Sequence, residues 1–515
     1  MKMYIFLLFF LSSILLASGF NLFSVLGSLP IDKGQVCYEN FGCYDKSEIS
    51  SEWPITKKLS FYPESPEKQN VTFYVFSCRD RFNPTIINYN VTEDNLKKMN
   101  YNPKNRTIFI VHGFTDYYEQ VNWMGNIKDY ILSMKPCLLN VIIVDWRGGS
   151  IVRNYLQAVA NTRLVGFVIA SLIKKLNKVY GTTNDHFTVM GHSLGGQISG
   201  FVGKNLQQPE KLRLIIGLDP AGPAYSDVSD KSRLNPNDAN LVITIQTNGG
   251  ENVANGLGIL KPSGHYSFFP NGGEDQEGCE QARGITNMLL RGISVGLSDT
   301  FACSHRRAYQ LMSFNESNFD DFQSLAHRCD NYEDFAAGKC GECEKPEDCI
   351  RWGGWYDYWQ EQKPPKNWEK PLVYFIKTRG ELPYSYYFYQ VLIKTSDKFE
   401  PIKAKLNLIM TGNVRSDYSV QISFEAKLEP NQTYPHLVFL AKSIGLVKSI
   451  NLKISTETKK NAYIYIDHIK VNYMNGYDES IRQKLSPKLK PVSEKDGKII
   501  INSPEATRFE YINEH

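Results

Sequence analysis

The sequence has no strong excess of either charge. Its 58 Lys and Arg residues face 54 Asp and Glu residues over 515 positions, which leaves a net charge of +4. Because the basic residues are also scattered, we expect no nucleic-acid partner. There is no tandem repeat and no low-complexity tract, and after the first residues no apolar run is long enough to span a membrane. With 42% hydrophobic residues, the composition is that of a globular protein.

The N-terminus carries an apolar run from Tyr4 to Leu16 that follows one lysine and precedes the small residues Ala17, Ser18 and Gly19. This pattern predicts a secretory signal peptide over residues 1–19. A membrane anchor is the alternative, but the run is shorter than the roughly 20 residues that span a bilayer. We therefore expect a soluble, secreted, extracellular protein.

Cysteine is absent after Cys349, and all ten cysteines lie from Cys37 onward. An even number in an exported chain predicts disulfides. Sequons for N-linked glycosylation, which predict exposed loops, begin at five positions: Asn70, Asn90, Asn105, Asn315 and Asn431.

The chain is too long for one ordinary hydrophobic core, and the pattern of its strand-like and helix-like segments changes along its length. Over residues 105–250, short apolar strands that end in turn residues alternate with helix-like stretches, which predicts an α/β fold with a mostly parallel sheet. Residues 372–515 hold short strand-like runs with no helical period, which predicts an all-β sandwich. We place the first domain at residues 20–360 and a proline-containing linker at 361–371.

The stretch VMGHSLGG sets Ser193 between Gly191 and Gly195, after a predicted strand and before a predicted helix. This is the context of a nucleophile elbow, in which glycines permit a sharp turn that exposes the serine at the edge of a sheet. A plain structural turn is the alternative. The backbone amides of Leu194, directly after the serine, and of the segment HGF at 112–114 are candidates for stabilising an oxyanion.

A serine nucleophile needs a base and a carboxylate that orients the base. Asp219 ends the apolar strand LRLIIGLD, where its side chain can reach the same edge of the sheet. Three histidines follow Ser193 in suitable contexts, namely His265, His305 and His327. The chain order of serine, acid and base does not choose among them.

Eight segments resemble the pancreatic lipase family in order and spacing over about residues 35–350: VCYENFGCY, FIVHGF, NVIIVDWRGGS, VMGHSLGG, IIGLDPAGP, RLNPNDA, GHYSFFPNGG and CSHRRAY. The resemblance implies an α/β-hydrolase fold followed by a PLAT-like sandwich that helps dock the protein on lipid. It implies a triad of Ser193, Asp219 and His305, with the amides of Phe114 and Leu194 as oxyanion donors.

The resemblance also implies roles for other residues. His112 and His192 become structural residues beside the site, and His265 a loop histidine. Four disulfides correspond to family pairs, Cys37 with Cys43, Cys279 with Cys303, Cys329 with Cys340 and Cys343 with Cys349. Cys78 and Cys137 are left, and their pairing stays open.

The family holds a structural calcium ion where this sequence has four polar residues, Asp230, Arg233, Asn235 and Asp238. Oxygen ligands on a short loop suit this cation. Asn235 stands where the family usually has an aspartate, which removes one negative charge and lowers the expected affinity. An ordinary solvated acidic loop is the alternative, and no cofactor is expected for the chemistry itself.

Between Cys279 and Cys303 lies a segment that the resemblance identifies as a lid over the nucleophile. Its apolar residues recur at helical spacing: Ile285, Met288, Leu289, Ile293 and Leu297. A mobile amphipathic cover suits an enzyme that acts at a lipid–water interface. A disulfide-bounded surface loop is the alternative.

The lid length and the long loop 248–266 favour a triacylglycerol lipase that cleaves acylglycerol esters over a phospholipase A1 or galactolipase with the same triad. A catalytically silent lipid-binding or storage protein is a third hypothesis. Members without activity typically lack a triad residue, whereas Ser193, Asp219 and His305 are all present. The sequence does not decide whether a small protein cofactor is needed.

Overall fold

The computed structural model describes most of the chain. The described residues are 34–46, 61–134, 136–250, 256–279, 302–313, 324–353, 359, 362–364, 369–414, 419–457, 463–476, 478–492 and 498–511. The predicted signal peptide and the interior of the predicted lid lie outside them.

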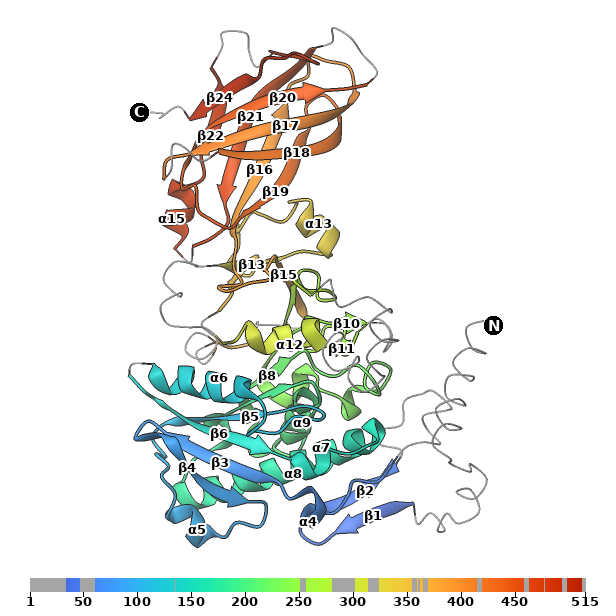
Figure 1. The fold of residues 1–515 in the computed structure, drawn as a ribbon, viewed down its shortest axis with the longest axis vertical. Helices are drawn as coiled ribbons and strands as arrows, with labels where there is room; N and C mark the ends of the chain where they lie inside the picture. Colours follow the sequence, from blue (N-terminus) through green and yellow to red (C-terminus); the bar gives the residue numbers. More distant parts are fainter. Residues whose placement is uncertain are drawn as a thin grey trace, which may run out of the picture.

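Eleven strands of the described chain form the sheet of the first domain, in the order β14-β13-β15-β12-β9-β8-β7-β5-β6-β3-β4 (Figure 1). Neighbours from β6 across to β15 run parallel, and the strands at both ends are antiparallel. The strands are β3 (Thr72–Ser77), β4 (Asp80–Asn88), β5 (Arg106–Val111), β6 (Leu139–Asp145), β7 (Phe187–His192), β8 (Leu212–Leu218), β9 (Ala239–Ile245), β12 (Tyr266–Pro270), β13 (Leu325–Arg328), β14 (Cys349–Arg351) and β15 (Leu372–Ile376).

The central strands are apolar along almost their whole length because helices cover both faces of the sheet. The long helix α8 (Tyr155–Tyr180) and α9 (Leu194–Lys204) pack on one face. The helices α6 (Asn122–Ser133) and α12 (Ala302–Gln310) pack on the other. The predicted α/β fold is therefore confirmed.

Helix α8 corrects the expectation that no segment after the N-terminus is long and apolar enough to span a membrane. By length and composition alone it could cross a membrane, with a mean hydropathy of 1.5 in its most apolar window. However, 78% of that window is buried inside the protein, as in the core helix of a folded domain. The helix ends at Gly181, whose φ of 68° lets the backbone turn left-handed and its amide cap the carbonyl of Asn177.

Short elements connect the larger ones. The hairpin strands are β1 (Gln35–Tyr38) and β2 (Gly42–Asp45), and a small parallel pair is β10 (Gly249–Gly250) with β11 (Gly258–Ile259). The short helices are α4 (Pro66–Gln69), α5 (Glu93–Lys97), α7 (Arg147–Ser150), α13 (Tyr332–Ala336), α15 (Glu479–Lys484) and the 3-10 turns η2 (Asn184–His186), η3 (Asp230–Ser232) and η4 (Pro236–Asp238).

The C-terminal domain is an antiparallel β structure around its own apolar core, as predicted (Figure 1). Its strands are β16 (Tyr387–Thr395), β17 (Ile402–Gly412), β18 (Ser419–Leu428), β19 (Thr433–Leu440), β20 (Val447–Ser455), β21 (Tyr463–Tyr473), β22 (Lys488–Pro491), β23 (Lys498–Ile500) and β24 (Thr507–Tyr511). Side chains of β17 and β20 meet side chains of β16 and β21 in that core.

The predicted domain boundary is one strand too early. The segment 372–376, expected to open the sandwich, is β15, and it pairs with β12 in the sheet of the first domain. A buried parallel strand and a sandwich strand are both short apolar runs, so the sequence did not distinguish them.

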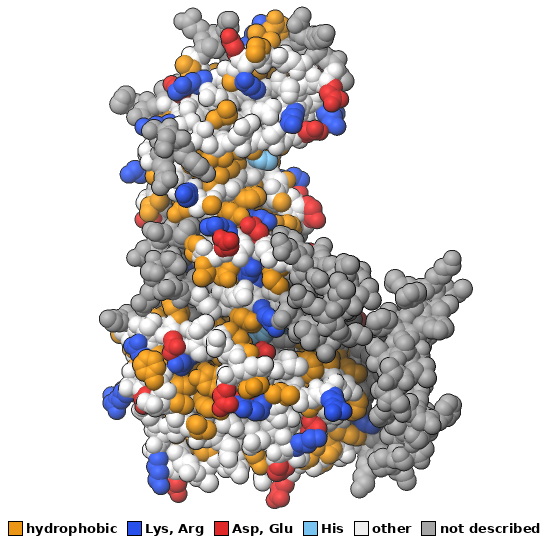
Figure 2. Space-filling view, in the orientation of Figure 1, with side chains coloured by type: hydrophobic (Ala, Val, Ile, Leu, Met, Phe, Trp, Pro, Cys, Tyr) orange, Lys and Arg blue, Asp and Glu red, His pale blue; other side chains and the backbone are white. Residues whose placement is uncertain are grey.

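The cysteines form five disulfides, the four expected pairs and Cys78–Cys137, which joins the end of β3 to the segment before β6. One predicted glycosylation site is not in an exposed loop: Asn105 is buried, and its side chain faces Cys137. On the face drawn in Figure 2, Lys and Arg side chains are interspersed with Asp and Glu side chains, in keeping with the small net charge.

Candidate active site

Ser193 lies in a sharp turn between β7 and α9. Its φ of 56° and ψ of −121° are unusual for a residue with a side chain. The flanking glycines allow the turn, because a Cβ on Gly191 would lie 2.0 Å from the carbonyl oxygen of Gly195, and one on Gly195 would lie 2.2 Å from that of Val111. The local geometry is that of the predicted elbow, with Ser193 at the carboxyl edge of the parallel sheet.

Asp219 follows β8, the strand next to β7 in the sheet. Its side chain is fully buried, and Oδ1 accepts hydrogen bonds from the backbone amides of Thr247 at 2.8 Å and Asn248 at 3.1 Å. Gly258 packs so closely that a Cβ there would lie 2.3 Å from Oδ1. These contacts fix the carboxylate and leave Oδ2 to face another group.

That group is His305, on α12. Its Nδ1 lies 2.5 Å from Oδ2 of Asp219. The other two candidates are engaged elsewhere: Nδ1 of His265 accepts a hydrogen bond from the amide of Val242, and Nδ1 of His327 lies 3.1 Å from Sγ of Cys349. Burial lowers the pKa of both His265 and His327 to about 4. The structure thus brings one of the three histidines to Asp219.

His192 joins the serine turn to α12. Its Nε2 donates to the backbone carbonyl of His305 at 3.1 Å, and the two imidazole rings lie 4.5 Å apart between centroids. Burial, followed by the neighbouring His305, lowers the pKa of His192 well below its usual value. Among the described residues, no hydrogen bond joins the hydroxyl of Ser193 to the ring of His305.

The segment 112–114 runs directly beside Ser193. A Cβ on Gly113 would lie 2.8 Å from Cβ of Ser193 and 3.3 Å from its Oγ. His112 holds this segment in place, because Nε2 accepts from the amide of Trp146 at 3.0 Å and Nδ1 therefore donates to the carbonyl of Gly113. Phe114 follows Gly113, and Leu194 is the first residue of α9.

A cavity of about 500 Å³ opens between α6 and α12. Its lining includes Asp116, Trp123, Arg306 and Tyr309. Burial raises the pKa of Asp116, although the neighbouring His112, Arg306 and His305 oppose that shift. The cavity is lined by both charged and aromatic side chains. The rings of Trp123 and Tyr309 stack with their centroids 4.9 Å apart.

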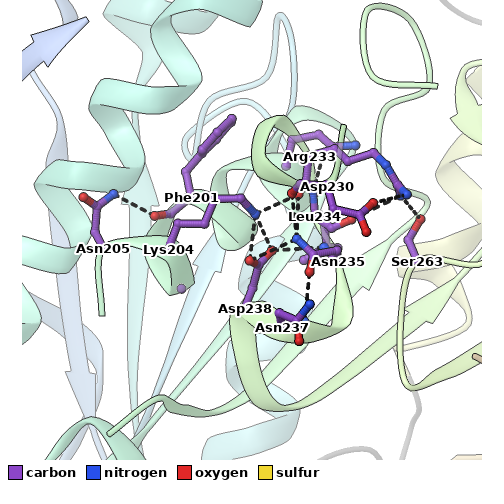
Figure 3. A network of polar contacts seen from close by, with 12 residues as sticks. Phe201, Lys204, Asn205, Asp230, Arg233, Leu234, Asn235, Asn237, Asp238 and Ser263 are labelled. Carbon is purple, nitrogen blue, oxygen red and sulfur yellow. Dashed lines mark hydrogen bonds and ion pairs between the residues drawn. The ribbon is translucent and has the colours of Figure 1, made fainter. Parts of the chain in front are cut away.

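The four residues predicted to bind calcium do lie together, on the loop 230–238 (Figure 3). The sequence did not predict that Lys204 would also lie there, with its ammonium against the carboxylate of Asp238. Burial raises the pKa of Asp238 to about 6 despite this partner, and burial lowers the pKa of Lys204.

The predicted lid is bounded as expected by the Cys279–Cys303 disulfide, which precedes His305 by two residues. Its apolar residues lie outside the described residues: Ile285, Met288, Leu289, Ile293 and Leu297.

The model of the family described as Lipase matches residues 34–384. The chain belongs to the lipase family. It is 30% identical to the pancreatic lipase-related protein 2 of Myocastor coypus over 81% of this chain and 85% of that one. It is also 30% identical to the pancreatic triacylglycerol lipase of Equus caballus (78% and 83%) and to the hepatic triacylglycerol lipase of Mus musculus (68% and 67%). As a lipase, the protein is a carboxylic ester hydrolase.

Sequence reasoning missed the residues of this lipase that act through the backbone or across long separations. Thr247 and Asn248 hold Asp219 with main-chain amides, which leave no signature in residue type. Lys204 reads as an ordinary lysine in the last turn of a helix.

Proposed function

We propose that this lipase hydrolyses triacylglycerols through a triad of Ser193, His305 and Asp219. The observation that carries the proposal is the hydrogen bond between Nδ1 of His305 and Oδ2 of Asp219, at the sheet edge where Ser193 occupies a strained turn. The names of the relatives support the substrate class, because two of them are triacylglycerol lipases.

The tautomer of His305 supports its role as the base. Since Nδ1 donates its proton to Asp219, Nε2 is the nitrogen that is free to accept one. In the proposed reaction Oγ of Ser193 attacks the ester carbonyl carbon and passes its proton to Nε2. The same proton then goes to the departing alcohol, and an acyl-enzyme remains. Water repeats the sequence with His305 as base, which releases the fatty acid and restores the serine.

The contact between Ser193 and His305 has to tighten when substrate binds. Catalytic hydrogen bonds are often long in structures without substrate, so its absence between the described residues is compatible with this role. Asp219 is proposed to orient the imidazole and to stabilise its protonated form, a role that its two backbone donors, Thr247 and Asn248, support by fixing the carboxylate.

The backbone amides of Phe114 and Leu194 are proposed to hold the oxyanion. Leu194 begins α9, where the amides of the first turn have no partner within the helix. The close passage of Gly113 beside Ser193 supports the contribution of the next residue, Phe114. Each such donor typically lowers the barrier by about 3 kcal/mol.

The proposed chemistry needs no cofactor, because the base, the acid and the oxyanion donors are groups of this chain. A calcium ion at the loop 230–238 would have a structural role only. We propose that the protein is exported, which the five disulfides support, and that it works at a lipid–water interface. The lid over residues 280–302 stays a prediction.

A side-by-side assay tests the substrate. The purified protein should release fatty acid from emulsified triolein faster than from phosphatidylcholine, and Ser193→Ala should reduce both to background without changing secretion or the melting temperature. Faster cleavage of phosphatidylcholine would make the protein a phospholipase A1. Full activity in a folded Ser193→Ala variant would exclude the triad.

A further inference from the structure

The ammonium group of Lys204 sits at the centre of the loop 230–238. Its Nζ lies 2.7 Å from each carboxylate oxygen of Asp238 and 2.7 Å from the backbone carbonyl of Arg233 (Figure 3). An ammonium has three protons, and here three oxygens surround it. The lysine comes from the last turn of α9, so a residue outside the loop supplies this cation.

Several other oxygens of the loop are also bound to donors of the chain. Oδ1 of Asp230 accepts from the guanidinium of Arg233 at 2.5 Å. The side-chain amide nitrogen of Asn235 donates to the carbonyl of Asp230 at 2.7 Å and to Oδ1 of Asp238 at 3.2 Å. The amide oxygen of Asn235 accepts from the backbone of Asn237 at 2.9 Å. Asn235 thus presents a donor to Asp238, where an aspartate would present another acceptor.

These residues do not fit a calcium ion. Calcium takes six to eight oxygen ligands, and its site usually carries surplus negative charge. In this loop two carboxylates, Asp230 and Asp238, already face two cations, Arg233 and Lys204. A divalent ion would have to displace the ammonium from Asp238, which is 2% exposed, and would leave an unpaired lysine beside it.

The loop leaves little space for an ion because it lies directly on α9. A Cβ on Gly203 would lie 2.1 Å from the carbonyl oxygen of Asp238, and one on Gly200 would lie 2.8 Å from Cα of Leu234. The two glycines therefore set the loop at backbone distance from the helix, next to Lys204.

We propose that Lys204 replaces calcium in this lipase: its ammonium is the built-in cation that holds the loop 230–238 on α9, so that the enzyme needs no divalent ion there. The arrangement also connects the loop to the candidate active site through α9. Helix α9 begins directly after Ser193, and Oε1 of Gln197 on its first turns accepts from the amide of Leu234 at 2.8 Å. The amide of Gln197 in turn donates to the carbonyl of Ala221, two residues after Asp219.

Thermal unfolding of the full-length protein tests the proposal without relying on activity. The melting temperature of the wild type should be the same in EDTA and in millimolar calcium chloride. Lys204→Met keeps the length of the side chain and removes its charge, which leaves Asp238 buried and unpaired, so it should lower the melting temperature by roughly 5 °C or more. Lys178→Met, which removes an exposed partner of Glu93, is the matched control and should change little.

A second variant adds a gain of function. Lys204→Met combined with Asn235→Asp removes the internal cation and restores the carboxylate, so its melting temperature should rise when calcium is added. Two results would overturn the proposal. One is a melting temperature of the wild type that rises when calcium is added. The other is a melting temperature of Lys204→Met in EDTA that equals that of the wild type. If Lys204→Met does not fold at all, the wild type alone still tests the proposal. An unchanged melting temperature in calcium supports it, and a raised one overturns it.

Discussion

Nδ1 of His305 and Oδ2 of Asp219 lie 2.5 Å apart, although 86 residues separate them in the sequence. The contact joins Asp219, directly after the central strand β8, to α12, which packs on the same face of the sheet as α6. It fixes the tautomer of the imidazole, and this property can be tested separately from the fold.

Asp219→Asn should lower kcat by about four orders of magnitude, because an amide at this position favours the wrong tautomer of His305. Folding should be preserved, since the side chain keeps its size and can still accept from Thr247 and Asn248. Triolein hydrolysis and melting temperature are the measurements. Asp185→Asn, before β7 at the opposite edge of the sheet, is the control and should keep full activity. Comparable activity in Asp219→Asn and the control would remove Asp219 from the mechanism.

Gly113→Ala should reduce activity strongly, because the new methyl group would lie 2.8 Å from Cβ of Ser193 and 3.2 Å from the carbonyl oxygen of His192. The segment has to move away, and the amide of Phe114 moves with it. Gly125→Ala on α6 is the matched control, because its Cβ meets nothing within 4 Å and alanine favours the helix. We expect the control to match the wild type in kcat/KM. Equal values for the two variants would show that the segment 112–114 does not support the serine.

The sequence predicted the parts of the site that depend on local pattern. Ser193 and Asp219 were found because a parallel strand leaves its last residue at the sheet edge, and the apolar runs before them mark those strands. The family resemblance was needed to choose His305, since three histidines had the right order along the chain.

What the sequence missed depends on contacts between distant segments. Lys204 meets Asp238 across 34 residues, and nothing in the helix pattern of α9 indicates that its last lysine turns towards a loop. The assignment of β15 failed for a related reason. Its Leu372 pairs with Tyr266 of β12, 106 residues earlier, and an apolar run does not identify the sheet that it joins.

The carboxylate of Asp145 should make the stability of the folded protein depend on pH. Although burial raises the pKa of Asp145, the neighbouring His112 and then the hydrogen bonds from Arg147 hold that pKa well below its usual range. A carboxyl whose folded pKa is depressed stabilises the fold above its unfolded pKa of about 3.9, and the contribution is lost as pH falls further. The melting temperature of the wild type should therefore exceed that of Asp145→Asn most at pH 6–7, and the gap should narrow below about pH 4. A gap that stays constant down to pH 2.5 would contradict the role of the charge.

The Cys78–Cys137 disulfide should contribute more to stability than Cys37–Cys43. The first pair closes a sequence separation of 59 residues and the second a separation of 6. In the loop-entropy account this corresponds to about 4 kcal/mol against about 2 kcal/mol, because a longer loop restricts the unfolded chain more. Replacing both cysteines of each pair by serine isolates the two contributions.

Tryptophan fluorescence during urea unfolding measures both contributions. It reports on the first domain, which holds both bridges, because all seven tryptophans precede residue 369. The Cys78→Ser/Cys137→Ser variant should unfold at a lower urea concentration than the Cys37→Ser/Cys43→Ser variant, with the wild type above both. In the presence of a reductant that opens both bridges, the three proteins should approach one another. If the two variants lose equal stability under oxidising conditions, native packing around each bridge outweighs the length of the loop that it closes, and the entropy account fails for this protein.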